Sequence, residues 1–90
     1  RIFSMRSRIL DTALSYRFTN VALFGSVARG DNTENSDIDF LVDALPGAHL
    51  GMFPDCMAEL SAIVGKNVDI VDRRGLKATD TSVLREQIFI

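Results

Sequence analysis

Asp37 and Asp39 are the residues of this chain whose type and spacing most readily suggest chemistry. They stand one residue apart at a predicted strand over residues 38–42, so both side chains should point to the same face. Two carboxylates held a few ångströms apart repel each other unless a cation lies between them. Hard oxygen ligands of this kind suit Mg²⁺. Taken alone, however, the pair is better explained by a strand with one solvated face.

A third carboxylate, Asp69, occupies the polar phase of another predicted strand, over residues 68–71. A helical crossover would place the two strands side by side or nearly so. Asp69 would then project from the same face as Asp37 and Asp39. Three carboxylates could bind two divalent ions, as in the two-metal sites that support in-line displacement at phosphorus. Asp72 is a rival for the third position, but it has the opposite phase and lies at the end of its strand.

A candidate phosphate site precedes these carboxylates in the chain. Gly25 and Ser26 follow a predicted buried strand over residues 21–24, where a helical turn is expected to begin. Backbone N–H groups at such a junction are free to meet an anion, and glycine allows a phosphate to come close. The Ser26 hydroxyl can donate a further hydrogen bond, and Arg29 could cover the same anion. Alone, Gly-Ser after a strand is more typical of a tight turn.

The elements that must position these residues follow from the hydrophobic pattern. Strands are predicted over residues 21–24, 38–42 and 68–71. Helices are predicted over residues 4–18, with Ser4 as the N-cap, Asn20 as the stop, and over residues 52–64, with Gly65 as the stop. A last helix, capped by Asp80 or Thr81, should run through Leu84 and Ile88. The order of these elements predicts an α/β fold with a small sheet.

Length and composition narrow the class of protein. The 90 residues fit one compact domain over residues 1–90. The net charge of −2 gives no electrostatic case for binding nucleic acid or an anionic membrane. The single cysteine, Cys56, cannot form an internal disulfide, which suits a reducing cytoplasm. No apolar run approaches the roughly 18 residues that span a bilayer. We therefore expect a cytoplasmic protein that acts away from membranes.

The motifs together resemble a known signature. Gly25-Ser26, ten further residues and then Asp37-Ile38-Asp39 resemble the signature of the polymerase-β-like nucleotidyltransferase superfamily. Residues 27–30 and Ser36 extend the likeness to the GSxARG…SDxD run of the minimal nucleotidyltransferases. Residues 67–71 resemble the strand that carries the third carboxylate in that family. The likeness covers nearly the whole chain, and the linked pattern is specific although each of its parts is not.

This resemblance implies a fold, a reaction and residue roles. The fold would be a small mixed β-sheet flanked by helices. The donor would be ATP or another NTP, and the reaction would depend on Mg²⁺, with two ions bound. Gly25 and Ser26 would hold the donor phosphates, with Arg29 and Ser36 as further nucleotide-binding residues. Asp37 and Asp39 would ligate both ions, and Asp69 would help to activate the acceptor.

The same resemblance implies a partner. Many minimal nucleotidyltransferases are antitoxins of HEPN/MNT toxin–antitoxin pairs, the MntA-type proteins, which transfer AMP to a tyrosine of an all-helical HEPN toxin. Here the chain shows no second domain for a small acceptor, which favours an acceptor supplied by a partner. Three alternatives stay open. The protein could neutralise a toxin by binding alone, could modify a small molecule, or could be an α/β protein whose acidic strand face is merely solvated.

The remaining conspicuous residues are expected to have structural roles. His49 should be a loop residue, Cys56 a core thiol, and Tyr16 a helix-packing or rim residue. We expect the aromatic side chains of Phe3, Phe18, Phe40 and Phe89 in the core. We expect a solvated basic edge around the third strand, made of Lys66, Arg73, Arg74 and Lys77.

Overall fold

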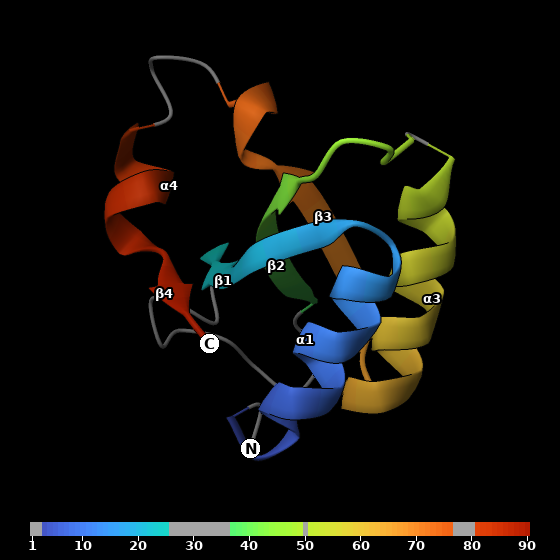
Figure 1. Ribbon diagram of the computed structural model, residues 1–90. Coiled ribbons are helices and arrows are strands. Elements are labelled where there is room, and N and C mark those ends of the chain that lie inside the picture. Colours follow the sequence, from blue (N-terminus) through green and yellow to red (C-terminus); the bar gives the residue numbers. More distant parts are fainter. Residues whose placement is uncertain (1–2, 26–36, 50, 77–80) are drawn as a thin grey trace.

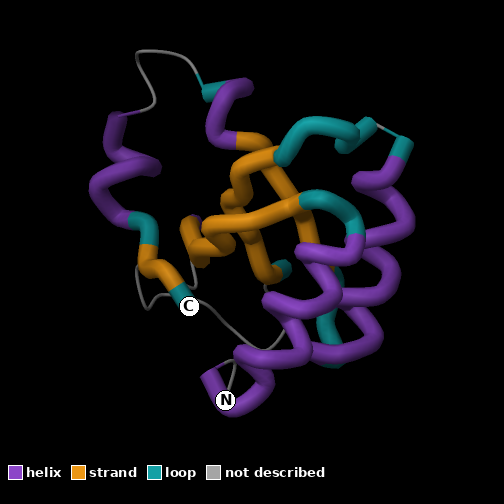
Figure 2. Tube along the Cα trace, in the orientation of Figure 1, coloured by secondary structure: helices purple, strands orange, loops and turns teal. Residues whose placement is uncertain are grey.

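The computed structural model describes residues 3–25, 37–49, 51–76 and 81–90 (Figure 1). Within these ranges the strands are β1 (Phe18–Phe24), β2 (Ile38–Ala44), β3 (Val68–Asp72) and β4 (Ile88–Phe89). The α-helices are α1 (Arg6–Ser15), α3 (Met52–Val64) and α4 (Thr81–Glu86), and short 3₁₀ turns cover Phe3–Met5 and Arg73–Gly75. Figure 2 shows the strands gathered in one sheet, with α1 and α3 side by side against it.

The sheet has the order β3-β2-β1-β4. β1 pairs antiparallel with both β2 and β4, whereas β2 and β3 are parallel. Parallel neighbours need a long crossover, and α3 provides it, since it lies between β2 and β3 in the chain. The sheet is therefore mixed and flanked by helices, as the family resemblance implied.

Helix α3 has the predicted bounds, Met52–Val64. It ends because Gly65 adopts a left-handed conformation with φ of 75° and donates its N–H to the Ser61 carbonyl at 2.8 Å. The Ser61 hydroxyl in turn accepts a hydrogen bond from the Val68 N–H at 3.1 Å. The end of the helix is thus bonded directly to the beginning of β3.

The N-terminal helix is shorter than the sequence predicted, at both ends. Ser4 lies in the 3₁₀ turn, and the N-cap is Met5, whose side chain makes no capping hydrogen bond. The helix ends at Ser15, and Arg17 then turns the chain with a φ of 68°. β1 consequently begins at Phe18. Asn20 lies inside this strand, with φ of 52°, at a register irregularity between Thr19 and Ala22.

The end of the chain also differs from the prediction. The last helix stops at Glu86 instead of running through Ile88, and Ile88 and Phe89 pair with β1 as a fourth strand. The Ile90 N–H extends this pairing with a hydrogen bond to the Val21 carbonyl at 3.2 Å. A two-residue strand has no periodicity of its own, so only its contact with β1 reveals it.

The hydrophobic core fills the space between α1, α3 and one face of the sheet. Phe18 and Phe40 are buried there as predicted, and the Phe18 ring lies 4.6 Å from that of Phe53. Cys56 is likewise buried in the core. The expectation for Phe89 was wrong, because its position on the edge strand β4 leaves it 56% exposed. The side chain of Phe3 lies outside the described residues.

None of the helices in the described part of the chain has the length and apolar character that crossing a bilayer requires.

Candidate active site

Asp39 and Asp69 are directly opposite each other on the parallel strands β2 and β3. The neighbours of Asp39 in β2, Ile38 and Phe40, point into the core beneath the helices. Because side chains alternate along a strand, the two aspartates project from the opposite face of the sheet. Asp39 is half-buried and Asp69 is exposed. The shared face that the sequence predicted for these two carboxylates is therefore formed.

Gly25 lies against the Asp39 carboxylate, on the side of β2 that faces away from Asp69. It directly follows β1, whose last residue, Phe24, is in register with Asp39. Gly25 has a φ of 73°, a conformation that L side chains rarely adopt, and a Cβ at this position would lie 2.5 Å from Asp39 Oδ2. Only glycine fits here, because its backbone is packed against the carboxylate. Gly25, Asp39 and Asp69 thus converge from three strands.

The remaining predicted site residues are less completely placed. Asp37 is exposed and immediately precedes β2, which begins at Ile38. The Ile38 N–H donates to the Asn67 carbonyl at 2.9 Å, so the start of β2 is held against the start of β3. Ser26, Arg29 and Ser36 lie outside the described residues, and their nucleotide-binding roles stay predictions.

The donor set suits a magnesium ion that also binds phosphate and water. Within the described residues, no three His, Cys, Asp or Glu side chains are arranged so that they could hold a metal ion, so Asp37, Asp39 and Asp69 do not form such a group. Mg²⁺, however, usually takes only one or two carboxylates and completes its shell with waters and substrate phosphates. The oxygen ligands of Asp39 and Asp69 therefore fit an ion that arrives with a nucleotide.

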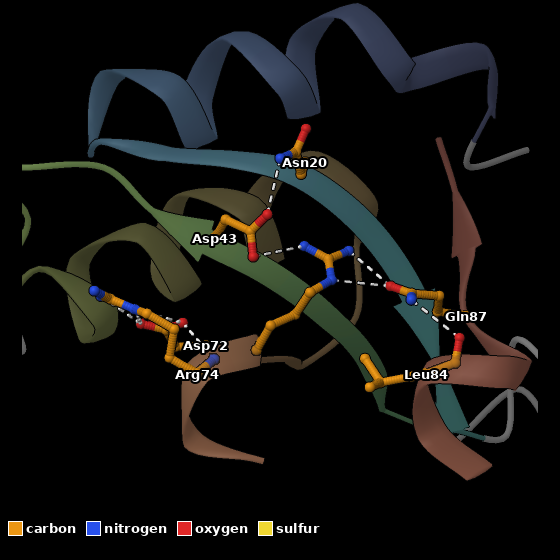
Figure 3. A network of polar contacts seen from close by, with 7 residues as sticks. Asn20, Asp43, Asp72, Arg74, Leu84 and Gln87 are labelled. Carbon is orange, nitrogen blue, oxygen red and sulfur yellow. Dashed lines mark hydrogen bonds and ion pairs between the residues drawn. The ribbon is translucent and has the colours of Figure 1, made fainter. Parts of the chain in front are cut away.

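Asp39 and Asp69 lie at one end of a sheet face that we call the polar face. At its other end the polar side chains bond to one another, as Figure 3 shows. Asp43, four residues after Asp39 on β2, accepts a hydrogen bond from Asn20 Nδ2 at 2.8 Å. Its Oδ1 lies 3.2 Å from Arg73 Nη1, an ion pair in which the nitrogen is buried and not aligned for a hydrogen bond. Nε and Nη2 of Arg73 donate to Gln87 Oε1 at 3.0 and 2.8 Å. This carboxylate already has its counter-charge within the protein.

The burial of Arg73 corrects a sequence prediction. Arg73 was expected on a solvated basic edge, yet only 14% of its side chain is exposed. A signal for this position does exist in the sequence, because Arg73 continues the phase of Asp69 and Val71 and so follows β3 on the polar face of the sheet. The signal is weak, because nothing near Arg73 in the sequence identifies Asp43 and Gln87 as its partners.

Asp72, the rival for the third carboxylate, is engaged elsewhere. Its Oδ1 accepts a hydrogen bond from the Arg74 N–H at 2.9 Å, and its Oδ2 lies 2.9 Å from Arg74 Nη2. The side-chain hydrogen bond from Arg74 lowers the pKa of the Asp72 carboxyl. Asp72 therefore caps the 3₁₀ turn that follows β3, while Asp69 faces Asp39.

Three other reactive side chains lie apart from this face. Burial raises the pKa of the Cys56 thiol to about 11, so it stays protonated and unreactive near neutral pH. Tyr16 donates its hydroxyl to Glu59 Oε1 at 2.7 Å, and this hydrogen bond raises the pKa of Tyr16 to about 12. His49 is exposed in the loop that leads to α3. Each has the structural role that the sequence predicted.

Sequence comparisons connect this geometry with known enzymes. A family model of polymerase β nucleotidyltransferases matches residues 9–90. The protein adenylyltransferase MntA of Thermococcus cleftensis is 37% identical over 71 residues, which are 78% of this chain and 72% of that protein. A candidate protein adenylyltransferase of Methanocaldococcus jannaschii is 37% identical over 62 residues. That alignment covers 69% of this chain and 63% of the relative, so the chain spans less than two thirds of its length.

Solved structures show the same relationship. One, described as a candidate minimal nucleotidyltransferase, superposes with a TM-score of 0.87 at 36% identity, over 99% of this chain and 92% of the other. A chain in a toxin–antitoxin complex with AMP-PNP superposes with a TM-score of 0.73 over 90% of this chain and 67% of its own length. At 24% identity the second likeness concerns the fold alone. With a family match over residues 9–90 and a solved relative 36% identical over almost its whole length, this chain belongs to the polymerase β nucleotidyltransferase family of enzymes.

Proposed function

We propose that this protein transfers a nucleoside monophosphate from a Mg²⁺-bound NTP to a hydroxyl group of a partner protein. The expected donor is ATP, so the transferred group is AMP. The acceptor is a tyrosine of a helical HEPN-type toxin, and the modification makes the chain its antitoxin. The name protein adenylyltransferase carried by a relative 37% identical supports transfer of AMP to protein. The toxin–antitoxin complex with AMP-PNP, one chain of which has this fold, supports the class of partner and the donor.

One observation carries the proposal. The Gly25 backbone is packed against the Asp39 carboxylate at a point where Asp69 stands in register on the next strand. Glycine at the end of a strand admits a phosphate group to the backbone, and two opposed carboxylates favour a divalent cation. Triphosphate and cation would therefore meet at the same place, as nucleotidyl transfer requires.

Each residue has a distinct role in this proposal. The Gly25 backbone binds donor phosphate, and Asp37 and Asp39 supply the oxygen ligands that orient the triphosphate. A bound Mg²⁺ would supply charge neutralisation on the phosphate oxygens, so that the acceptor hydroxyl could attack the α-phosphorus in line while pyrophosphate leaves. Asp69 lies at the exposed margin, where it can accept the proton of an incoming acceptor hydroxyl. The protein contributes chiefly position and charge, as in other phosphoryl-type transfers.

The acceptor is expected to come from a partner surface. Asp37 and Asp69 are both exposed, so a protein hydroxyl could approach them directly. At the other edge of the sheet from Asp69, the C-terminal segment carries the exposed apolar side chains of Leu84, Ile88 and Phe89. Exposed apolar residues that lie near one another are typical of surfaces that bind another protein. This arrangement favours a protein acceptor over a small molecule.

Labelled ATP tests the proposal directly. The purified chain is incubated with α-³²P-ATP and Mg²⁺, with and without the protein encoded beside it, and the products are separated on a denaturing gel. We expect label on that partner, and at least about a 100-fold loss of labelling with Asp39→Asn, because a preorganised charge contact is lost. Asp11→Asn is the matched control, since Asp11 is exposed on α1, away from the polar face.

Two outcomes would contradict the proposed reaction, and a third would contradict the proposed site. If no NTP labels any acceptor and the two proteins nevertheless form a tight complex, the chain is an antitoxin that acts by binding. Label on a small hydroxyl compound instead of the partner would make it a nucleotidyltransferase with a small-molecule acceptor. Undiminished labelling by Asp39→Asn would remove Asp39 from the site.

A further inference from the structure

The side chain of Arg73 crosses the polar face of the sheet. Arg73 directly follows β3, at one edge, yet its guanidinium reaches residues at the other edge, where β4 lies. It donates two hydrogen bonds to Gln87 Oε1, at 3.0 and 2.8 Å, and its Cζ lies 4.9 Å from the centre of the Phe89 ring. A charged side chain that is only 14% exposed needs such partners, because burying an unpaired charge is costly. Arg73 therefore joins the C-terminal segment to the body of the sheet.

This network includes a residue from, or next to, every strand of the sheet. Asn20 lies in β1 and Asp43 in β2, while Arg73 follows β3 and Gln87 precedes β4 (Figure 3). Each is bonded to the next, from Asn20 through Asp43 and Arg73 to Gln87. The contacts of Arg73 therefore add a second link between β4 and the rest of the sheet, beside the direct pairing of β4 with β1.

Besides its pairing with β1 and the packing of the neighbouring Ile90 against the core, β4 itself buries little surface. It consists of two residues, and their side chains, Ile88 and Phe89, are 41% and 56% exposed. Apolar burial thus contributes little to its docking, and short terminal strands are prone to fray. The Gln87 amide is also committed internally, since its Nε2 donates to the Leu84 carbonyl at 3.0 Å. Gln87 is accordingly an anchor for Arg73, not a ligand-binding group.

The anchored segment lies beside the proposed active site. Leu23 is in register with Ile88, so continuing the pairing by one residue brings Gln87 level with Phe24. Phe24 is also in register with Asp39 and is followed by Gly25. Displacement of β4 would leave the end of β1 held by β2 alone, next to the point where the Gly25 backbone lies against the Asp39 carboxylate.

We propose that Arg73 is a positioning residue for nucleotidyl transfer. It holds β4 against β1 and so fixes Gly25 relative to Asp39. This inference rests on the proposed function, and it assigns a role to a residue whose guanidinium contacts Asp43 and Gln87, toward the opposite end of the polar face from Asp39 and Asp69. Misplacement of a reacting group by about 1 Å can cost on the order of 100-fold in rate, so a loosened Gly25 would be measurable.

The test compares Arg73→Lys with Arg74→Lys. Lysine keeps a positive charge near Asp43 but loses the planar fork that binds Gln87. Arg74 is the matched control, because it adjoins Arg73 and its side chain is 72% exposed. Amide exchange at Ile90, whose N–H bonds to the Val21 carbonyl, reports whether β4 is docked. Steady-state kinetics with ATP report separately whether the site is affected.

For Arg73→Lys we expect faster exchange at Ile90 and a KM for ATP raised about tenfold, with a smaller fall in kcat, since the loosened Gly25 binds phosphate less well. Arg74→Lys should behave as the wild type. Adding Gln87→Glu to Arg73→Lys should restore much of the KM, because a carboxylate can pair with the ammonium group. A purely structural role would predict lower stability with no such split between KM and kcat.

Three results would overturn the inference, and they are distinguishable. Unchanged exchange at Ile90 in Arg73→Lys would mean that Arg73 does not hold β4. Faster exchange with wild-type KM and kcat would mean that β4 does not position the site. Absence of transfer by the wild-type protein itself would refute the proposed function, and with it this role for Arg73, before any variant is considered.

Discussion

Asp39 and Asp43 stand on the same face of β2 and have opposite surroundings. Asp39 faces a second carboxylate, Asp69, on the neighbouring strand, whereas Asp43 is bonded to Asn20 and paired with the buried Arg73. The first end of the face brings two carboxylates into register, an arrangement that a divalent cation would stabilise. The second end balances its charge with the chain's own residues. The difference separates a site suited to ligand binding from a network suited to holding the fold.

At the Asp39 end of the polar face, the packing of Gly25 against the carboxylate should matter most for ligand binding. We expect Gly25→Ala to lower the free energy of unfolding by about 1–3 kcal/mol, because a Cβ adds strain at positive φ and meets the carboxylate. Binding of Mg²⁺–ATP should be lost as well. Urea unfolding and a nucleotide titration measure the two effects.

Gly65→Ala is the matched control for that experiment. Gly65 has nearly the same φ, 75°, but a Cβ there would meet nothing within 4 Å. It should therefore cost only about 1 kcal/mol, the price of the left-handed backbone, and leave nucleotide binding intact. Equal effects of the two substitutions on nucleotide binding would show that contact with Asp39 is unimportant.

Removing one negative charge at each end of the polar face should change the free energy of unfolding in opposite directions. Asp43→Asn should lower the free energy of unfolding by about 1–2 kcal/mol, because Arg73 is left without its counter-charge and solvent screens only part of the loss. Asp69→Asn should raise it by up to about 1 kcal/mol in the absence of divalent ions, because opposed like charges are destabilising. Urea unfolding in EDTA checks both. A destabilised Asp69→Asn would contradict the electrostatic contrast between the two ends.

The smallest expected effect concerns Asp72, which has an exposed partner. The hydrogen bond from Arg74 lowers the pKa of Asp72 in the folded protein. A carboxyl whose folded pKa is lowered stabilises the protein above its unfolded pKa, and this contribution is lost as the pH falls through the folded value. An NMR titration should therefore place the midpoint of Asp72 below the ordinary value for aspartate. Arg74→Ala should move it upward, and an unchanged midpoint would show that the ion pair is not formed in solution.

Much of the scaffold could be predicted because it follows from local patterns. The helical spacing of apolar residues, ended by Gly65, predicted α3 with its observed bounds. Period-two alternation predicted β2 and β3 within two residues at their ends. The family resemblance then implied the mixed sheet, and the phase of Asp69 predicted that it would share a face with Asp39.

Sequence patterns alone were enough to predict the elements with a regular apolar spacing, α3, β2 and β3, and the linked motif residues from Gly25 to Asp69. Three features became visible only in the folded structure: Arg17 turns the chain after α1, Ile88 and Phe89 form a strand, and Arg73 is buried. These features depend on partners distant in the chain, since β4 exists through its pairing with β1 and Arg73 through Asp43 and Gln87. The local sequence of a short segment cannot indicate such contacts, because they stabilise the protein only after the chain has brought the distant partners together.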